Sequence, residues 1–255
     1  MTAPRTYQTE AIIIKRIKLG EADRILTIYT PELGKLKAVA KGTRRPKSKL
    51  GGHVELLTHS RLMLARGRNL DIITQAQTID NFLQIKDDLE RISRGLYLAE
   101  LVDSFTGEHI EDRRLFKLLL ETLKQLSLSK DYESILRYFE LHLLDHLGYR
   151  PQLQHCTDCN SPLKPDINFF CSSLGGVLCH QCGFNEPTAR PISLNTLKVL
   201  RLWQNCDFTA ARRVRINREL AVELEQVMRE YIKYLLEKQL KSTAWLDRLK
   251  NEIYK

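Results

Sequence analysis

The hydrophobic pattern of this chain changes its period once, near residue 80, and this change does most to limit the possible folds. Over residues 7–76, apolar and polar side chains alternate with a period of about two, which is typical of half-buried strands. After Asp80, apolar residues recur about every 3.6 positions, as in amphipathic helices. Strands followed by helices indicate an α+β protein, and 255 residues allow two or three domains.

Five short strands are expected before the change of period. They cover Tyr7–Leu19, Arg24–Thr30, Lys35–Ala40, His53–Ala65 and Leu70–Gln77. Glycine, proline and polar residues between them supply tight turns. Five such strands in about seventy residues predict a small closed barrel of the oligonucleotide-binding (OB) type, although a small open sheet also satisfies the pattern.

Helical spacing returns in two blocks. The expected helices are Leu89–Phe105, Arg113–Leu126, Tyr132–Leu147, Leu194–Leu202, Glu219–Leu240 and Ala244–Ile253. The segment between the blocks carries the cysteines. The predicted domains are therefore an OB-fold (1–79), a first helical part (80–150), a metal-binding insertion (151–190) and a second helical part (191–255).

Six cysteines bear on the compartment and on metal binding. The N-terminus lacks the apolar core of a secretory signal, and no apolar run approaches the ~18 residues of a membrane span. We therefore expect a cytoplasmic protein with reduced thiols, in which the cysteines are metal ligands or free thiols.

Four of these cysteines form two Cys-x-x-Cys pairs with nineteen residues between the pairs. Cys156, Cys159, Cys179 and Cys182 fit one structural Zn²⁺ held by four thiolates, a closed site that does not activate water. Free thiols remain the alternative. Cys171, His155 and His180 are spare donors that could replace a ligand.

Positive charge is concentrated in one stretch. Residues 35–68 hold ten basic residues and one acid, a net charge of +9, which equals that of the whole chain. Such a patch attracts polyanions, and nucleic acid is the commonest inside cells. The candidate DNA-binding residues are Lys35, Lys37, Lys41, Arg44, Arg45, Lys47, Lys49, Arg66 and Arg68. The alternative is a solvated loop that aids solubility.

A second basic cluster precedes the helix expected at Glu219–Leu240. Arg212, Arg213 and Arg215 form either a second phosphate-contacting patch or a solvated approach to the helix. His142 and His146 lie four residues apart on one helix, but without a neighbouring glutamate we interpret them as surface or half-buried histidines. Trp203 is interpreted as a core residue.

No catalytic residue is predicted. The chain lacks the phosphate-binding GxxxxGK[ST] pattern and the GxSxG and HExxH motifs. Two adjacent acid pairs, Asp87–Asp88 and Glu111–Asp112, would be poor Mg²⁺ ligands for a nuclease because neighbouring side chains on a helix diverge. We interpret them as helix starts, and we expect a protein that is not an enzyme.

Three stretches together resemble the bacterial recombination mediator family RecO. They are GEADRILTIYTPELGKLKAVAKGTRRPKSKLGG (20–52), LLDHLGYRPQLQHCTDCN (143–160) and LGGVLCHQC (174–182). The resemblance runs from about residue 9 to residue 246 and implies an OB-fold, a helical body and an inserted zinc site at the four paired cysteines. It also places Lys37 and Lys41 where family members contact DNA. Cys171 matches no family ligand.

What the resemblance implies about function is a role in DNA repair at the bacterial nucleoid, without enzymatic activity. RecO-like proteins bind single- and double-stranded DNA, anneal complementary strands and, with RecR, help RecA replace single-strand-binding protein (SSB) on gapped DNA. Few aromatic residues surround Lys37, the nearest being Tyr29, which favours contact with the backbone over base stacking. The competing hypotheses are an adapter whose helical body docks other proteins, including RecR and the SSB C-terminal tail, and a metal-dependent nuclease.

Overall fold

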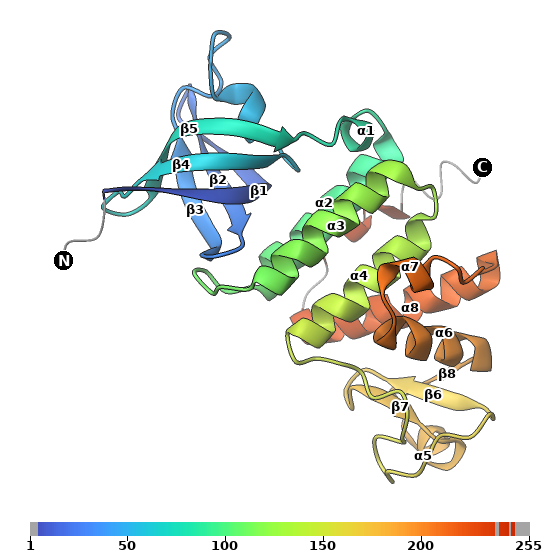
Figure 1. The fold of residues 1–255 in the computed structure, drawn as a ribbon. Coiled ribbons are helices and arrows are strands. Elements are labelled where there is room, and N and C mark those ends of the chain that lie inside the picture. Colours follow the sequence, from blue (N-terminus) through green and yellow to red (C-terminus); the bar gives the residue numbers. More distant parts are fainter. Residues whose placement is uncertain (1–4, 238–239, 245, 248–255) are drawn as a thin grey trace. The chain divides into compact units, whose positions relative to one another are not determined.

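The computed structural model describes residues 5–237, 240–244 and 246–247 (Figure 1). Its residues group into two compact units, Met1–Ser129 with Leu240–Lys255, and Lys130–Gln239. The predicted domain limits after residues 79 and 150 fall inside these units, so they stay predictions. No helix in the described part of the chain is both long and apolar enough to cross a membrane.

The first unit begins with a closed barrel of five strands. These are β1 (Thr6–Leu19), β2 (Asp23–Thr30), β3 (Gly34–Ala40), β4 (His59–Ala65) and β5 (Asp71–Asp80). Their order around the barrel is β1-β2-β3-β5-β4. The long strand β1 pairs antiparallel with both β2 and β4, and a short parallel pairing of β3 with β5 closes the ring. The predicted five-stranded barrel is confirmed.

The alternation that predicted the strands fills the inside of the barrel. Leu26 and Ile28 of β2 and Leu36 and Ala38 of β3 are almost completely buried in one apolar cluster. Since successive side chains of a strand point to opposite faces, the residues between them lie on the outer surface or at an edge. The outer surface of β3 is therefore where its lysines are expected.

The predicted fourth strand begins too early. Residues 51–54 form a 3₁₀-helix, η1 (Gly51–Val54), and β4 starts only at His59. Val54 is completely buried in the barrel core, and Leu57 has a left-handed backbone with φ 60°. The prediction of a strand from His53 is wrong because these apolar residues enter the core from a turn instead of alternating across a sheet.

Three helices follow the barrel in the first unit: α1 (Leu83–Lys86), α2 (Leu89–Phe105) and α3 (Arg113–Leu128). The carboxylate of Asp88 accepts backbone N–H groups at the start of α2, and that of Asp112 does so at the start of α3. The interpretation of these acids as helix starts is confirmed for both. On the barrel side, Phe116 of α3 stacks against Tyr29, with 6.5 Å between ring centroids.

The second unit combines helices with a small sheet. Its helices are α4 (Tyr132–His146), α5 (His180–Asn185), α6 (Leu194–Asn205), α7 (Phe208–Ala211) and α8 (Arg218–Leu236), and its strands are β6 (Asn168–Cys171), β7 (Gly176–Leu178) and β8 (Arg190–Ile192). The strands form one sheet in the order β7-β6-β8. Most of the helix predicted over Ala244–Ile253 lies outside the described residues.

Two sequence interpretations concern the helical core of this unit. Trp203 is completely buried, and its indole N–H donates to the carbonyl of Ala211 at 3.3 Å. The ring of His142 lies 3.0 Å from the carbonyl of Trp203 and packs against Tyr138 at a tilt of 34°, with ring centroids 4.1 Å apart. The predictions of a core position for Trp203 and a half-buried one for His142 are therefore confirmed.

Candidate nucleic-acid interface and metal centre

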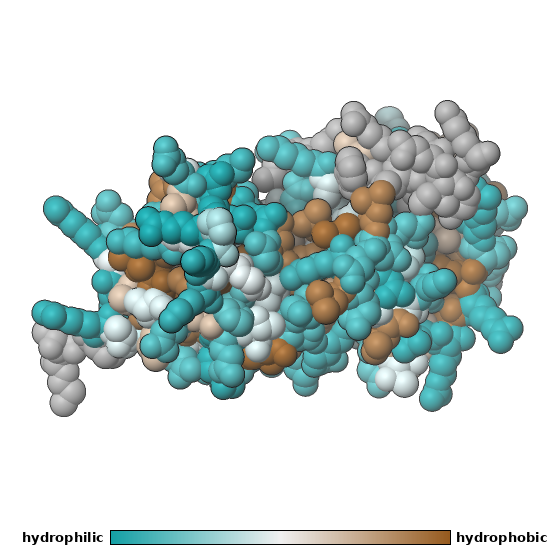
Figure 2. Space-filling view, turned by 90° about the horizontal axis from the view of Figure 1, so that it is seen from above, coloured by the Kyte–Doolittle hydropathy of each residue, from teal (hydrophilic) through white to brown (hydrophobic). Residues whose placement is uncertain are grey.

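The basic loop, residues 41–49, leaves the end of β3 and leads to η1. Its five basic side chains are all exposed, and none forms an ion pair with an acid that the structure describes: Lys41, Arg44, Arg45, Lys47 and Lys49. Figure 2 shows the surface of the barrel covered largely by hydrophilic side chains, several of them extended into solvent. These cations are therefore available to an external anion.

Hydrogen bonds fix the backbone of the basic loop, while its basic side chains remain exposed. Gly42 N–H donates to the carboxylate of Asp23 at 2.7 Å, and Arg44 N–H donates to the carbonyl of Ala22 at 3.0 Å. Glu55, the one acid within residues 35–68, pairs instead with Arg16 and with Arg24. It therefore does not neutralise the loop.

The two lysines of β3, unlike those of the basic loop, form ion pairs with acids. Lys35 is only 8% exposed, and its ammonium donates to the carbonyl of Asp103 at 2.5 Å and pairs with the carboxylate of the same residue at 3.4 Å. Lys37 is exposed, but its ammonium lies 2.5 Å from a carboxylate oxygen of Glu108. A DNA contact by Lys35 would require this buried pair to break.

Arg66 and Arg68 are exposed on the turn between β4 and β5. The guanidinium of Arg66 lies 5.2 Å from the centre of the Tyr7 ring, and the Tyr7 hydroxyl donates to Asp71 at 2.5 Å. Burial, together with this hydrogen bond, raises the pKa of Tyr7. Tyr7 and Arg66 line a cleft of about 410 Å³.

The second basic cluster lies in the other unit, between α7 and α8. Arg212, Arg213 and Arg215 are all exposed. Arg215 and Lys198 line a cleft of about 620 Å³, which also includes residues at the starts of α6 and α8. The cluster is therefore accessible, as a phosphate-contacting patch must be.

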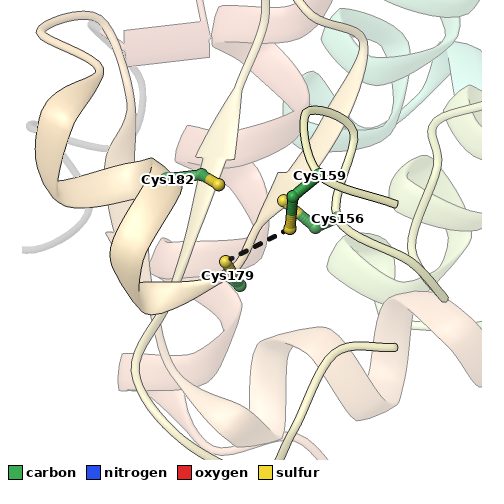
Figure 3. A group of neighbouring side chains, drawn as sticks. All are labelled: Cys156, Cys159, Cys179 and Cys182. Carbon is green, nitrogen blue, oxygen red and sulfur yellow. Dashed lines mark hydrogen bonds between the residues drawn. The ribbon is translucent and has the colours of Figure 1, made fainter. Parts of the chain in front are cut away.

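The four paired cysteines converge on one point (Figure 3). The sulfur atoms of Cys156, Cys159, Cys179 and Cys182 all lie within 4.8 Å of one another, and those of Cys159 and Cys179 are 3.8 Å apart. A tetrahedral zinc ion with bonds of about 2.3 Å to sulfur separates its ligands by about 3.8 Å. The four thiols therefore have the geometry of a metal centre.

Two tight turns create this arrangement. After Cys156 the chain turns at Asn160, whose N–H donates to the carbonyl of Cys156 at 3.0 Å and whose φ is 56°. After Cys179 it enters α5, where Gly183 N–H donates to the carbonyl of Cys179 at 2.8 Å. Each turn brings two sulfur atoms to the same side, as a Cys-x-x-Cys pair requires.

The other possible donors have different partners. The sulfur of Cys171 lies 3.1 Å from the hydroxyl of Ser173, and the ring of His180 stacks on Phe184. Hydrogen bonds from Ser161 lower the pKa of Cys159 to about 6, whereas Asp158 and the neighbouring thiols raise the pKa of Cys182. Metal ligation requires thiolates, and a bound cation would stabilise that form.

Comparison with known proteins places the whole chain in one family. The family described as Recombination protein O N terminal matches residues 1–82, and Recombination protein O C terminal matches residues 86–244. The chain belongs to the RecO family of DNA repair proteins. The resemblance found in the three sequence stretches is confirmed.

Several curated relatives match this chain over most of their length. The DNA repair protein RecO of Dehalococcoides mccartyi (strain CBDB1) is 43% identical over 250 residues, which is 98% of each chain. That of Roseiflexus sp. (strain RS-1) is 45% identical over 243 residues, covering 95% of this chain and 86% of the relative. That of Desulforamulus reducens is 36% identical over 245 residues.

Sequence reasoning gave no role to two residues of this RecO chain that adjoin predicted site residues. Tyr7 lies beneath Arg66, and Glu108 pairs with Lys37. An aromatic residue at the start of the first strand was a weak signal for Tyr7. No local signal indicated Glu108, because its partner is 71 positions away in the sequence. The aromatic residue that was considered, Tyr29, is 1% exposed and thus closed to a nucleobase.

Proposed function

We propose that this RecO chain is a recombination mediator that binds single- and double-stranded DNA without sequence preference through its barrel. The observation that carries the proposal is the basic loop, in which five exposed cations lack an acidic partner among the described residues. Cations of this kind bind phosphates and release their counterions. Phosphate contacts position DNA but read no sequence.

We further propose that the protein anneals complementary strands and, with RecR, helps RecA displace SSB on gapped DNA. Neutralised phosphates let two strands approach, while the base edges stay free to pair. The burial of Tyr29 supports a contact with the backbone in place of base stacking. Annealing needs no catalytic residue because base pairing itself makes it favourable. With DNA as the ligand, the proposed place of action is the nucleoid in the bacterial cytoplasm.

The experiment compares two triple variants that lose the same charge. Replacing Lys41, Arg44 and Arg45 by Gln should weaken binding to labelled single strands and duplexes about 10- to 100-fold at low salt, on all sequences alike. The control replaces Arg114, Lys117 and Lys124, which are exposed on α3 of the same unit. Fluorescence anisotropy gives the affinities. Equal losses in both variants would reduce the effect to net charge and remove the loop assignment.

The four-cysteine centre is proposed to hold one structural Zn²⁺. When bound, the ion would fix two chain turns that have little core of their own, and four thiolates would leave no position open for water. Native mass spectrometry should detect one zinc ion in the wild-type protein and none in Cys179→Ser. Cys171→Ser should keep the ion, because the sulfur of Cys171 is directed to hydroxyl groups.

Arg212, Arg213 and Arg215 are proposed as a second DNA patch. Their exposure supports this role. Replacing all three by Gln should lower DNA affinity less than the basic-loop variant does and equally for every sequence. DNA affinity equal to that of the wild type would exclude a DNA contact by these residues.

An adapter role is the second candidate function. It is favoured by apolar side chains exposed near the metal centre, above all Phe184, which is 79% exposed on α5. Pull-down with RecR and with the SSB C-terminal tail tests it. Loss of either partner in Phe184→Ser, with DNA binding unchanged, would support the adapter role.

A further inference from the structure

The connection between α2 and α3, residues 106–112, lies along strand β3. Its Glu108 forms a parallel bridge with Lys35, and the N–H of His109 donates to the Lys35 carbonyl at 2.8 Å. At the start of β3, a Cβ atom on Gly34 would lie 1.9 Å from the carbonyl oxygen of Ile110. Only glycine permits this approach, so the connection is seated by backbone contacts at a fixed place on the strand.

This seating brings the Glu108 carboxylate to Lys37. The ammonium of Lys37 lies 2.5 Å from a carboxylate oxygen of Glu108, and both side chains are nearly half exposed. The hydrogen bond from Lys37 lowers the pKa of Glu108, and the same bond raises the pKa of Lys37. Both groups are therefore charged near neutral pH and form an ion pair that solvent can reach.

A carboxylate and a phosphate engage an ammonium in the same way, through charge-assisted N–H···O hydrogen bonds. We propose that Glu108 occupies the phosphate position at Lys37, so that DNA and the α2–α3 connection compete for this lysine. The inference rests on the proposed function and adds a residue that sets the extent of the DNA footprint. The basic loop has no such competitor among the described residues.

The competition gives an order to binding. DNA first meets the unpaired cations of the basic loop, and Lys37 joins only when Glu108 yields. Since an exposed ion pair is weak, a phosphate held nearby by the loop suffices to displace the carboxylate. Glu108 thus weakly inhibits the contact between DNA and Lys37 of β3.

The test uses variants that remove the same negative charge from the same connection. Glu108→Gln should bind single-stranded DNA about three-fold more tightly at low salt, and its plot of log K against log salt should be steeper by about 0.7. Glu111→Gln is the matched control, because Glu111 pairs with Arg113 at 3.0 Å and not with β3. Its affinity should stay close to that of the wild type.

A double-variant cycle separates competition for Lys37 from general electrostatics. In the Lys37→Gln background, Glu108→Gln should no longer increase affinity beyond the Glu111→Gln control. If Glu108→Gln acts equally with and without Lys37, or equals Glu111→Gln in the wild type, the inference is overturned. A basic-loop variant that weakens DNA binding in the same assay would leave the proposed function standing in that case; absence of DNA binding by the wild type would overturn both.

Discussion

The cysteine centre and the basic loop both gather like groups, but they gather them differently. Four sulfur atoms converge within 4.8 Å of one another, whereas the five cations of the loop are spread along nine residues and are exposed. Convergence suits a single small ion that many ligands share. A spread of separate charges suits a polymer that carries a charge at every step. The two regions thus differ in the ligand that their geometry suits, a single cation in one unit and a polyanion in the other.

A similar contrast exists within the barrel. The lysines of β3 are matched by acids, Lys35 by Asp103 and Lys37 by Glu108, while the basic loop that follows in sequence has no matching acid among the described residues. A high local density of basic residues therefore does not make all of them ligand-binding. The buried pair with Asp103 holds Lys35 inside the unit, whereas the exposed cations of the basic loop are open to the proposed DNA ligand.

The largest effect is expected from a change that disrupts only the four-cysteine centre. Cys179→Ser, or removal of metal by a chelator, should lower the free energy of unfolding of the second unit by more than about 4 kcal/mol, because metal binding and local folding are coupled. Limited proteolysis should then cut within residues 151–190. Wild-type affinity for DNA at the basic loop should persist, and its loss would show that the two regions are not independent.

A smaller effect on stability should distinguish Lys35, which pairs with an acid, from Lys47, which is exposed and has no acidic partner among the described residues. Lys35→Ala should destabilise the protein by about 2 kcal/mol because it leaves the half-buried carboxylate of Asp103 with fewer partners. Lys47→Ala should change the free energy of unfolding by less than about 0.5 kcal/mol and yet weaken DNA binding. Urea titration and anisotropy measure the two quantities. The reverse pattern would contradict the division between paired and open cations.

The smallest effect is expected from the protonation of His59, a buried residue of the barrel. Burial lowers the pKa of His59 below its usual 6.5, although Glu10 acts in the opposite direction. The unfolded chain then binds a proton at a higher pH than the folded chain does. Stability should therefore be complete above pH 6.5 and should decrease as the pH falls below it, by about 1 kcal/mol or less.

His59→Gln isolates this contribution. Glutamine keeps a donor for Glu10, which lies 3.1 Å from the His59 ring, but it cannot gain a charge. Chemical denaturation at pH 7.5 and pH 5.5 should show a smaller difference in the variant than in the wild type. Identical differences would assign the pH dependence to other groups, among them His142, whose pKa is also lowered by burial.

Local patterns in the sequence were enough to predict the barrel and the four cysteines that cluster. Alternation at Leu26 and Ile28 depends only on neighbours in a strand, and the spacing of Cys156 and Cys159 depends only on one turn. The burial of Lys35 and the pairing of Lys37 could not be predicted in this way. They depend on Asp103 and Glu108, nearly seventy or more positions away, which fold onto β3 only in the complete unit.

The early start predicted for β4 has a related cause. Apolar side chains such as Val54 look the same in a strand and in a turn that enters the core, and only the closed barrel decides between them. Sequence patterns therefore located the basic stretch. Which of its basic residues pair with acids inside the unit could be seen only from the tertiary contacts.

The salt dependence of single-stranded DNA binding tests the central claim most directly. If the basic loop engages about four phosphates, log K should fall against log salt with a slope near −3, and replacing Arg44 and Arg45 by Gln should reduce that slope by about 1.4. A slope that stays the same in this variant would contradict the account, because neither arginine at the centre of the loop would then neutralise a phosphate.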